Sequence, residues 1–169
     1  MVRSPGIFLG LGSNVGDREL YLKRAGEELH EEGIQVLETS SLYETEPVEA
    51  PPQEWFLNSV VRVETSLTPL ALLNTCLAIE TRLGRVRQGF MSPRTLDIDL
   101  LLFRDEIHQA PGITVPHPRL HARRFVLVPL AEIAPEERHP VLGRTMAELL
   151  ARCQDTSRVL PRKLPVPPG

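Results

Sequence analysis

The chain has 169 residues, enough for one domain with a sizeable buried core, and its 41% hydrophobic and 24% charged residues are ordinary for a globular protein. Its net charge of −3 gives no overall electrostatic reason to expect nucleic acid or an anionic membrane as a partner. No stretch reaches the roughly 18 apolar residues of a membrane-spanning helix. Two cysteines are too few for a disulfide framework, so we expect a cytoplasmic protein.

The first part of the chain alternates short apolar runs with one helical pattern. Residues 7–11 form an apolar run that ends in a Gly-Ser-Asn loop, as expected of a buried strand. A helix is predicted over residues 18–32, which Asp17 can cap and Gly33 can end. Residues 34–42 then resume an extended pattern.

The next segment contains a long loop followed by a second strand and a second helix. Residues 44–55 carry three prolines and are predicted as a loop, which at this length is usually functional or disordered. Residues 57–65 alternate as expected of a central strand. Thr68-Pro69 is a typical helix start, and apolar residues recur at helical spacing until Gly84.

A basic loop over residues 84–94 leads into the stretch 93-PRTLDIDLLLF-103, which we predict as the next strand. The predicted order is therefore strand, helix, strand, strand, helix, strand. This order indicates an α+β protein with a ferredoxin-like βαββαβ core, in which an antiparallel sheet carries both helices on one face.

The remainder of the chain is predicted to complete this core. Residues 114–125 form a basic loop interrupted by prolines, and residues 125–133 and 145–153 are predicted as extra C-terminal helices that cover the remaining sheet surface. We expect a single domain over residues 1–160 and a proline-rich tail, disordered or extended, over residues 161–169.

Two aspartates stand at the head of the last predicted strand. Asp97 and Asp99 are two residues apart and therefore point to the same face, which Leu101 and Phe103 continue, whereas Leu102 belongs to the opposite face. Two carboxylates at this spacing suit Mg²⁺, which completes its coordination with water and phosphate oxygens. They could also flank two metal ions about 3.5–4 Å apart.

The neighbourhood of the aspartates favours phosphate chemistry. An Asp-x-Asp pair alone is a weak signal, and the pair could instead lie on a solvated strand end beside Arg94. However, Arg85, Arg87 and Arg94 all precede the pair, and the planar guanidinium group binds phosphate oxygens two at a time. Metal ions and arginines together would counter the charge of a polyphosphate.

Three further side chains are candidates for ligand binding. His117 lies between two prolines and just before three arginines, although a lone histidine is more often a polar surface or capping residue. Phe56 and Asn58 share a strand face and could stack on and hydrogen-bond a flat heterocycle, or could be a core Phe and an edge Asn. The glycine-containing loop 10–17 matches neither common nucleotide-binding fingerprint.

These motifs resemble one enzyme family. The strings 9-LGLGSNVGDR-18, 93-PRTLDIDLLLF-103 and 114-TVPHPRLHARRFVLVPLAEIAP-135 are similar to those of 6-hydroxymethyl-7,8-dihydropterin pyrophosphokinase, and the similarity extends over about residues 6–150. The resemblance implies an α+β fold with a ferredoxin-like core. It also implies transfer of diphosphate from ATP to the hydroxymethyl group of the pterin, with release of AMP, in folate biosynthesis.

The resemblance also implies roles for individual residues. Asp97 and Asp99 would bind two Mg²⁺ ions that bridge the phosphates of ATP, and Arg85 and Arg94 would close over those phosphates as further catalytic residues. The positions that match ATP contacts are Glu80, Arg87, the backbone at Leu100, Thr114, His117 and Arg123. The positions that match the pterin pocket are Thr45, Val48, Phe56, Asn58 and Phe125, with Phe56 and Phe125 on the two faces of the ring.

Two positions depart from the family pattern, and alternatives remain open. Phe90-Met91-Ser92 stands where many members have Arg-Trp-Gly, and Glu46 stands where some have proline; we expect activity to survive both. The alternative function is a non-catalytic nucleotide- or pterin-binding regulatory module on the same fold. An RNA-binding domain is disfavoured by the net charge and by the lack of paired strand aromatics. We therefore predict ATP and the pterin as partners, and neither nucleic acid nor a membrane.

Overall fold

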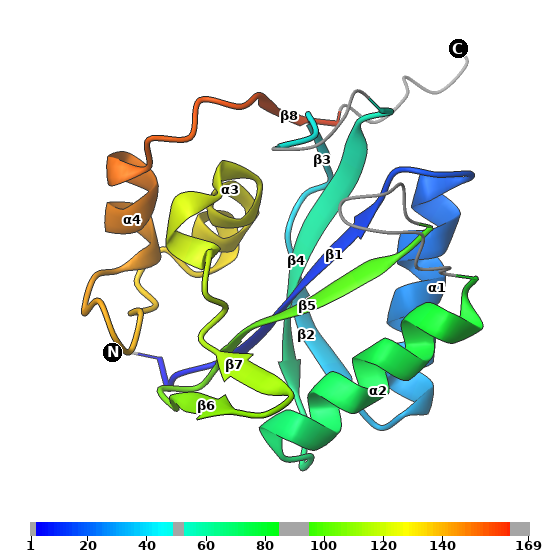
Figure 1. Cartoon of the computed structure of the whole chain (residues 1–169), viewed down its shortest axis with the longest axis horizontal. Helices are drawn as coiled ribbons and strands as arrows, with labels where there is room; N and C mark the ends of the chain where they lie inside the picture. Colours follow the sequence, from blue (N-terminus) through cyan, green and yellow to red (C-terminus); the bar gives the residue numbers. More distant parts are fainter. Residues whose placement is uncertain (1–2, 49–52, 85–94, 163–169) are drawn as a thin grey trace.

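The computed structural model describes residues 3–48, 53–84 and 95–162 (Figure 1). The strands are β1 (Ile7–Ser13), β2 (Gln35–Thr39), β3 (Tyr43–Thr45), β4 (Phe56–Glu64), β5 (Asp97–Phe103), β6 (His108–Ala110), β7 (Ile113–Val115) and β8 (Val159–Pro161). The helices are α1 (Arg18–Glu31), α2 (Pro69–Arg82), the short 3₁₀ helix η1 (Leu120–Ala122), α3 (Arg124–Ile133) and α4 (Met146–Arg152).

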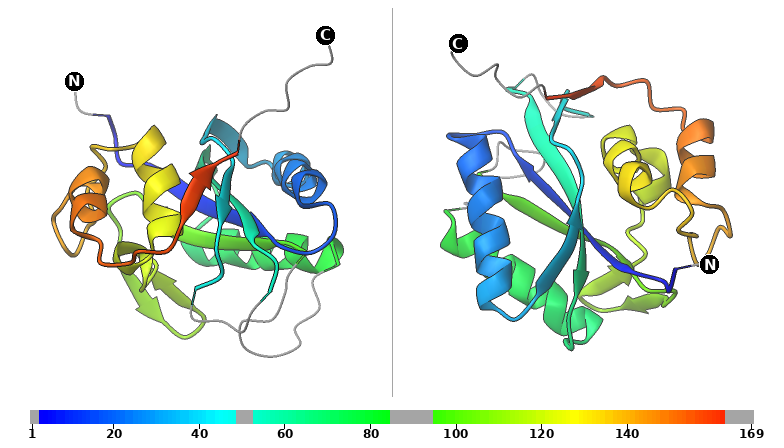
Figure 2. Two further views of the ribbon diagram at one scale, coloured as in Figure 1. Left: turned by 90° about the horizontal axis from the view of Figure 1, so that it is seen from above. Right: turned by 180° about the vertical axis from the view of Figure 1, so that it is seen from behind.

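An antiparallel sheet forms the centre of the molecule. Its strands follow the order β5-β1-β4-β3-β8, and β2 pairs with the other end of β4. Helices α1 and α2 cover one face, and α3 and α4 lie on the other (Figures 1 and 2). The predicted ferredoxin-like core, its antiparallel sheet and the extra C-terminal helices are therefore confirmed.

The extended segment predicted over residues 34–42 is a strand only at its start, and a separate strand follows it. Strand β2 ends at Thr39 and β3 begins at Tyr43, and both pair with β4. Ser40 bridges the interruption, because its N–H donates to the Val60 carbonyl and its hydroxyl accepts from the Val60 N–H, each at 2.9 Å. Strand β3 also occupies the first residues of the loop predicted over residues 44–55, so that prediction was wrong at its start.

The helix starts lie where capping residues predict them. The side chains of Asp17 and Thr68 accept hydrogen bonds from backbone N–H groups three residues further on, at 3.1 and 3.2 Å. These bonds satisfy donors that have no partner within the helix. Gly33 and Gly84 follow the helix ends with φ angles of 77° and 89°, a left-handed conformation that glycine adopts without strain.

Two apolar cores lie on opposite faces of the sheet. The core beneath α1 and α2 contains, among others, Ile7, Leu9, Leu22, Ala25, Leu29, Leu72, Cys76, Ile79, Ile98 and Leu100. The core beneath α3 and α4 contains, among others, Phe8, Val60, Leu101, Leu102, Leu127, Leu130, Met146 and Leu149. The sheet is therefore buried on both faces, which fixes β5 firmly at the point where it carries the aspartates.

The prediction of which side chains share a face of β5 was wrong for the residues after Leu101. Strand β5 pairs with β1 through a bulge at Leu101, because Leu9 opposes Leu100 and Phe8 opposes Leu102. An extra residue in one strand reverses the alternation of side chains after it. As a result Leu102 joins the core under α3, and Phe103 joins the core under α1 and α2, the reverse of the predicted assignment.

The C-terminal segment is attached to the sheet. Strand β8 pairs with β3, and the Arg162 N–H donates to the Leu42 carbonyl at 2.8 Å. The predicted division into a domain over residues 1–160 and a tail over residues 161–169 stays a prediction, since residues 163–169 lie outside the described part of the chain. Within that described part, no helix has the length and apolar character needed to cross a membrane.

Candidate functional site

Two cavities adjoin the N-terminal end of β5. The first, of about 290 Å³, lies on the sheet face that carries α3. The second, of about 230 Å³, lies between α2, β5 and β7. Asp97, Asp99 and His117 line both cavities, so they stand at the boundary where two bound molecules would meet.

The first cavity brings together residues from distant parts of the chain. It is bordered by β1, the end of β3, the start of β4 and the first turn of α3. All five residues predicted for the pterin pocket line it, namely Thr45, Val48, Phe56, Asn58 and Phe125. Two aromatic rings and two hydrogen-bonding side chains in one cavity suit a flat heterocycle with polar edges.

Two polar side chains in this cavity, Asn58 and Thr45, are hydrogen-bonded to each other. Asn58 is 9% exposed, and its amide nitrogen donates to the Thr45 hydroxyl at 2.5 Å. Its amide oxygen occupies the space in which a Cβ atom on Gly12 would lie, so a side chain at Gly12 would displace it. Gly12 therefore has a specific steric reason to be glycine.

Gly10 and Gly12 are site residues that the sequence reasoning missed. Both line the first cavity, and in the register of the sheet Gly10 opposes Asp99 and Gly12 opposes Asp97. The signal available in the sequence was their spacing, since two glycines two residues apart on a strand leave one face without side chains. This open face gives a ligand access to the aspartates.

The second cavity has one apolar and one polar side. Leu73 and Leu77 of α2 lie on the apolar side with Leu100 and Val115. The leucines of α2 were not predicted as site residues, because they follow the ordinary apolar pattern of a core helix. Of the residues predicted for ATP, this cavity contains Glu80, Leu100, Thr114 and His117.

Glu80 is a buried carboxylate with a structural hydrogen bond. Its side chain is 2% exposed, and one oxygen accepts a hydrogen bond from the backbone N–H of Ile98 at 2.8 Å. This bond ties α2 to β5 at the residue between the two aspartates. Its position beside the second cavity is consistent with the ATP contact expected from the resemblance, which stays a prediction.

His117 is neutral at physiological pH. Burial and the nearby charge of Arg123 lower the pKa of His117 to about 4, although Asp97 acts in the opposite direction. Its Nδ1 accepts a hydrogen bond from the backbone N–H of Arg119 at 3.2 Å, so the proton of the neutral ring lies on Nε2. The imidazole can therefore donate one hydrogen bond to a phosphate oxygen without carrying a charge.

The predicted arginines divide into two groups. Arg85, Arg87 and Arg94 lie outside the described residues, as does the variant segment 90–92. Arg123 lines the first cavity rather than the second, with its guanidinium 5.6 Å from the centre of the Phe125 ring. Arg119, one of the three arginines that follow His117, lines the first cavity as well.

The aspartate pair fits a metal ion that a substrate helps to bind. Among the described residues, no group of three or more His, Cys, Asp or Glu side chains is placed to hold a metal ion. Two carboxylates beside two cavities instead suit Mg²⁺, which commonly takes one or two protein carboxylates together with phosphate and water oxygens. The residues present therefore fit the predicted Mg²⁺ site.

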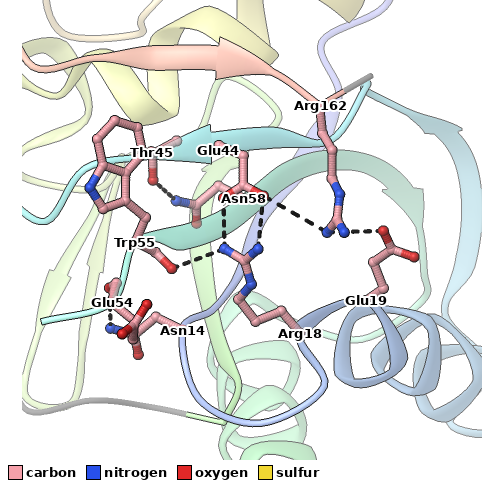
Figure 3. A network of polar contacts seen from close by, with 9 residues as sticks. All are labelled: Asn14, Arg18, Glu19, Glu44, Thr45, Glu54, Trp55, Asn58 and Arg162. Atoms are coloured by element: carbon pink, nitrogen blue, oxygen red, sulfur yellow. Dashed lines mark hydrogen bonds and ion pairs between the residues drawn. The ribbon is translucent and has the colours of Figure 1, made fainter. Parts of the chain in front are cut away.

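An ion-pair network supports the wall of the first cavity (Figure 3). Arg18 donates two hydrogen bonds to the Glu44 carboxylate, at 2.7 and 2.8 Å, and a third to the Trp55 carbonyl at 3.0 Å. Asn14 donates to the Glu54 carbonyl at 3.1 Å. The start of α1 is thereby joined to β3, and both it and the loop after β1 are joined to the segment that leads into Phe56.

Comparison with known proteins identifies close relatives. A Bacillus subtilis protein named 2-amino-4-hydroxy-6-hydroxymethyldihydropteridine pyrophosphokinase is 48% identical over 127 residues, which cover 75% of this chain and 76% of that protein. A Methylorubrum extorquens protein of the same name is 44% identical over 146 residues, covering 86% and 91%. The folic acid synthesis protein fol1 of Schizosaccharomyces pombe is 40% identical over 144 residues, covering 85% of this chain and 20% of that protein.

Solved structures share the fold at lower sequence identity. A Plasmodium falciparum HPPK-DHPS structure with pterin and p-hydroxybenzoate matches with a TM-score of 0.69 at 19% identity, over 90% of this chain and 43% of that chain. The family model described as 7,8-dihydro-6-hydroxymethylpterin-pyrophosphokinase (HPPK) matches residues 8–135, well over half of the sequence. With this match and relatives more than 40% identical along most of their length, the chain belongs to the 7,8-dihydro-6-hydroxymethylpterin-pyrophosphokinase family.

Proposed function

We propose that the protein transfers diphosphate from ATP to the hydroxymethyl group of 6-hydroxymethyl-7,8-dihydropterin, releasing AMP, as a step of folate biosynthesis. Membership of the family supports this activity. The single structural observation that carries it is the pair of cavities that meet at Asp97, Asp99 and His117. We also propose a cytoplasmic location, as expected of a chain whose two cysteines are both free.

The first cavity is the proposed pterin site. Phe56 and Phe125 offer ring faces for stacking, and Asn58 and Thr45 offer hydrogen-bonding groups at the edge of the ring. A pterin bound here would extend its hydroxymethyl group toward the aspartates at the cavity boundary. Holding the reacting oxygen at that place removes much of the entropic cost of bringing two substrates together.

The second cavity is the proposed ATP site. Leu73, Leu77 and Leu100 offer apolar surface for the adenine base, and Glu80, Thr114 and His117 offer polar contacts. The polyphosphate would extend toward Asp97 and Asp99, which would hold two Mg²⁺ ions. When bound, Mg²⁺ neutralises phosphate charge and orients the polyphosphate for transfer.

The protein's own groups would then promote a direct transfer. The hydroxymethyl oxygen forms a bond to the β-phosphorus of ATP, the bond from that phosphorus to the AMP oxygen breaks, and the hydroxyl proton is released. Neutral His117 donates a hydrogen bond to a phosphate oxygen, while the guanidinium groups of Arg119 and Arg123 contribute positive charge near the transferred group. Arg85, Arg87 and Arg94 are proposed to add to that charge.

Identification of the released nucleotide tests the proposal. The protein is incubated with ATP, Mg²⁺ and the reduced pterin, and the nucleotide products are separated by chromatography. AMP, formed in amounts equal to the diphosphorylated pterin, is the expected result. ADP would indicate ordinary phosphoryl transfer, and binding without either product would favour the regulatory module.

A further inference from the structure

A segment near the C-terminus, residues 155–162, contacts both sides of the first cavity although none of its residues lines that cavity. We infer that this segment holds the two sides at the separation the pterin requires, and that Arg158 is its main positioning residue. The inference rests on the proposed function for the identity of the bound molecule. It assigns a role in pterin affinity to residues that touch neither substrate.

On one side, the segment caps the helix that carries Phe125. Helix α3 begins at Arg124, and the residue before it, Arg123, makes no capping bond with its own side chain. Asp155 takes this role, because its Oδ2 accepts a hydrogen bond from the Arg124 N–H at 2.9 Å. A carboxylate at a helix N-terminus satisfies an unpaired donor and interacts favourably with the helix dipole.

The same carboxylate is also fixed within its own segment. Its Oδ1 accepts a hydrogen bond from the Ser157 N–H at 2.9 Å. Burial alone would raise the pKa of Asp155, but the hydrogen bonds from Arg124 and Ser157 outweigh burial and hold that pKa below its ordinary value. Asp155 is therefore ionised at neutral pH, in the state that caps α3 best.

On the other side, the segment continues the sheet and binds Glu46. Strand β8 pairs with β3, with Val159 opposite Thr45. The Glu46 N–H donates to the Arg158 carbonyl at 3.1 Å, and the Arg158 N–H donates to Glu46 Oε1 at 2.5 Å. The Arg158 Nε lies 3.6 Å from Glu46 Oε2, which adds an ion pair to these two hydrogen bonds.

These bonds give Glu46 a structural role. A proline at this position would have no N–H and no carboxylate, and could form neither of the hydrogen bonds between Glu46 and Arg158. Glu46 also lines the first cavity, next to Thr45. Glu46 therefore joins the rim of the cavity to the C-terminal segment.

Arg158 also contacts Trp55, on the same side of the first cavity as Glu46. Its guanidinium lies 4.8 Å from the centre of the Trp55 ring, within the range of a cation–π interaction. Trp55 directly precedes Phe56, and its carbonyl accepts a hydrogen bond from Arg18 at 3.0 Å (Figure 3). The residue before the predicted stacking ring is thus held both by its backbone and by its side chain.

Substitution of Arg158 tests the inference. We expect Arg158→Ala to raise the KM and the dissociation constant for the pterin about two- to fivefold, because an exposed cation–π contact accounts for a change of that size. The effect is modest because the Arg158 side chain is 66% exposed. The KM for ATP and kcat should stay at the wild-type values, since Arg158 lines neither cavity.

Matched variants distinguish a positioning role of Arg158 from the general effect of removing a positive charge. Arg158→Lys keeps a cation that can lie over Trp55 and should restore most of the affinity, whereas Arg152→Ala removes an equal charge from α4 and should bind like the wild type. Trp55 is the only tryptophan of the chain, so its emission should change in Arg158→Ala and not in Arg152→Ala. In the double variant Glu46→Ala/Arg158→Ala, the loss should be smaller than the product of the two single losses.

Two results would overturn the inference. The first is a pterin dissociation constant in Arg158→Ala equal to that of the wild type, measured by calorimetry without ATP. The second is an equal loss of affinity for ATP and pterin together with a lower melting temperature, which would mark a general structural role. If the wild-type protein binds the pterin but releases no AMP, the proposed activity is wrong. Weaker pterin binding by Arg158→Ala would support the inference even in that case.

Discussion

Asp97 and Asp99 border both cavities because β5 presents them on a face that the opposing glycines of β1 leave open. Two residue-level properties produce this arrangement: the two-residue repeat of a strand and the absence of a side chain on glycine. Both properties belong to single strands, but the pairing of β5 with β1 is what places the aspartates opposite the glycines. Helices α2 and α3 then supply further sides of the two cavities.

Replacement of Asp97 should remove activity without unfolding the protein. Asp97→Asn keeps the shape of the side chain but removes the charge that would bind Mg²⁺. We expect the rate of Mg²⁺-dependent AMP release to fall by at least about 100-fold, the size of effect seen when a key electrostatic group is removed. The thermal unfolding curve should stay close to that of the wild type.

An exposed aspartate on the same part of the chain provides the control. Asp105→Asn, in the turn after β5, removes an equal charge at a position that lines neither cavity and should leave AMP release unchanged. AMP release at the wild-type rate in Asp97→Asn would remove Asp97 from the proposed metal site.

A second residue-level prediction concerns a hydrogen bond between α3 and β3. The Tyr43 hydroxyl donates to Glu132 at 2.6 Å, and Ser41 donates to the same carboxylate from its N–H and its hydroxyl. Burial would raise the pKa of Glu132, but these hydrogen bonds outweigh burial and lower it below the ordinary value of 4.5. We expect Tyr43→Phe to reduce the free energy of unfolding by about 1 kcal/mol at pH 7.

The sign of the pH dependence follows from the lowered pKa of Glu132. A carboxyl group with a depressed pKa in the folded state contributes stability above its unfolded pKa and loses it as the pH falls through the folded pKa. The difference between wild type and Tyr43→Phe should therefore shrink as the pH falls below about 4.5 in urea unfolding experiments. Tyr21→Phe is the matched control, and a difference that persists in acid would contradict the assignment.

At the scale of whole elements, local signals predicted the helices well. Capping side chains at Asp17 and Thr68 and glycines after the helices placed the ends of α1 and α2 within one residue or so, because these signals act over a few neighbouring residues. The bulge at Leu101 had no such signal. It arises from the pairing of β5 with β1, which joins residues far apart in the sequence.

The capping of α4 permits a prediction about stability alone. The Thr145 hydroxyl accepts from the Glu148 N–H at 3.1 Å, and the Glu148 carboxylate accepts from the Thr145 N–H at 3.2 Å, so a full capping box is present. We expect Thr145→Ala to lower the free energy of unfolding by about 1 kcal/mol in urea denaturation. Thr145→Ser keeps the hydroxyl and should lose much less.

Loss of this cap should not change the rate of AMP release. None of the residues of α4 lines either cavity, so AMP release by Thr145→Ala at 25 °C, far below unfolding, should equal that of the wild type. A fall in AMP release while the protein remains folded would show that α4 influences the site through α3.

At the scale of the whole molecule, the two cavities form one site with a shared boundary. Asp97, Asp99 and His117 line both, so a ligand bound in one cavity would change the surroundings of the other. Two ligands that complete each other's binding surfaces bind cooperatively, and each affects the other's affinity by the same factor. We therefore expect ATP and the pterin to bind cooperatively in the assembled fold.

Thermal unfolding with each ligand measures this cooperativity. An ATP analogue with a methylene group between the α and β phosphorus atoms prevents turnover. A saturating ligand stabilises a protein by about 2.7 kcal/mol at 100 times its dissociation constant. We expect the shift in melting temperature with analogue, Mg²⁺ and pterin together to exceed the sum of the separate shifts, and Asp97→Asn to lose this excess.

The sequence by itself determined the order of the βαββαβ core, the capped helix starts and the shared face of Asp97 and Asp99, but not the short strands β6, β7 and β8. These features follow from periodicity and capping, which depend on residues within one or two turns of each other. The family motifs added the set of pterin and ATP residues. Those that the structure describes lie around the two cavities, and their roles stay predictions.

Only the tertiary structure decided which groups support that site. The reversal of Leu102 and Phe103, the open face made by Gly10 and Gly12, and the apolar side contributed by α2 depend on strand register and helix packing. The contact between Glu46 and Arg158 joins residues 112 positions apart. No local pattern encodes such a pair, because its two members meet only when β8 adds to the edge of the sheet.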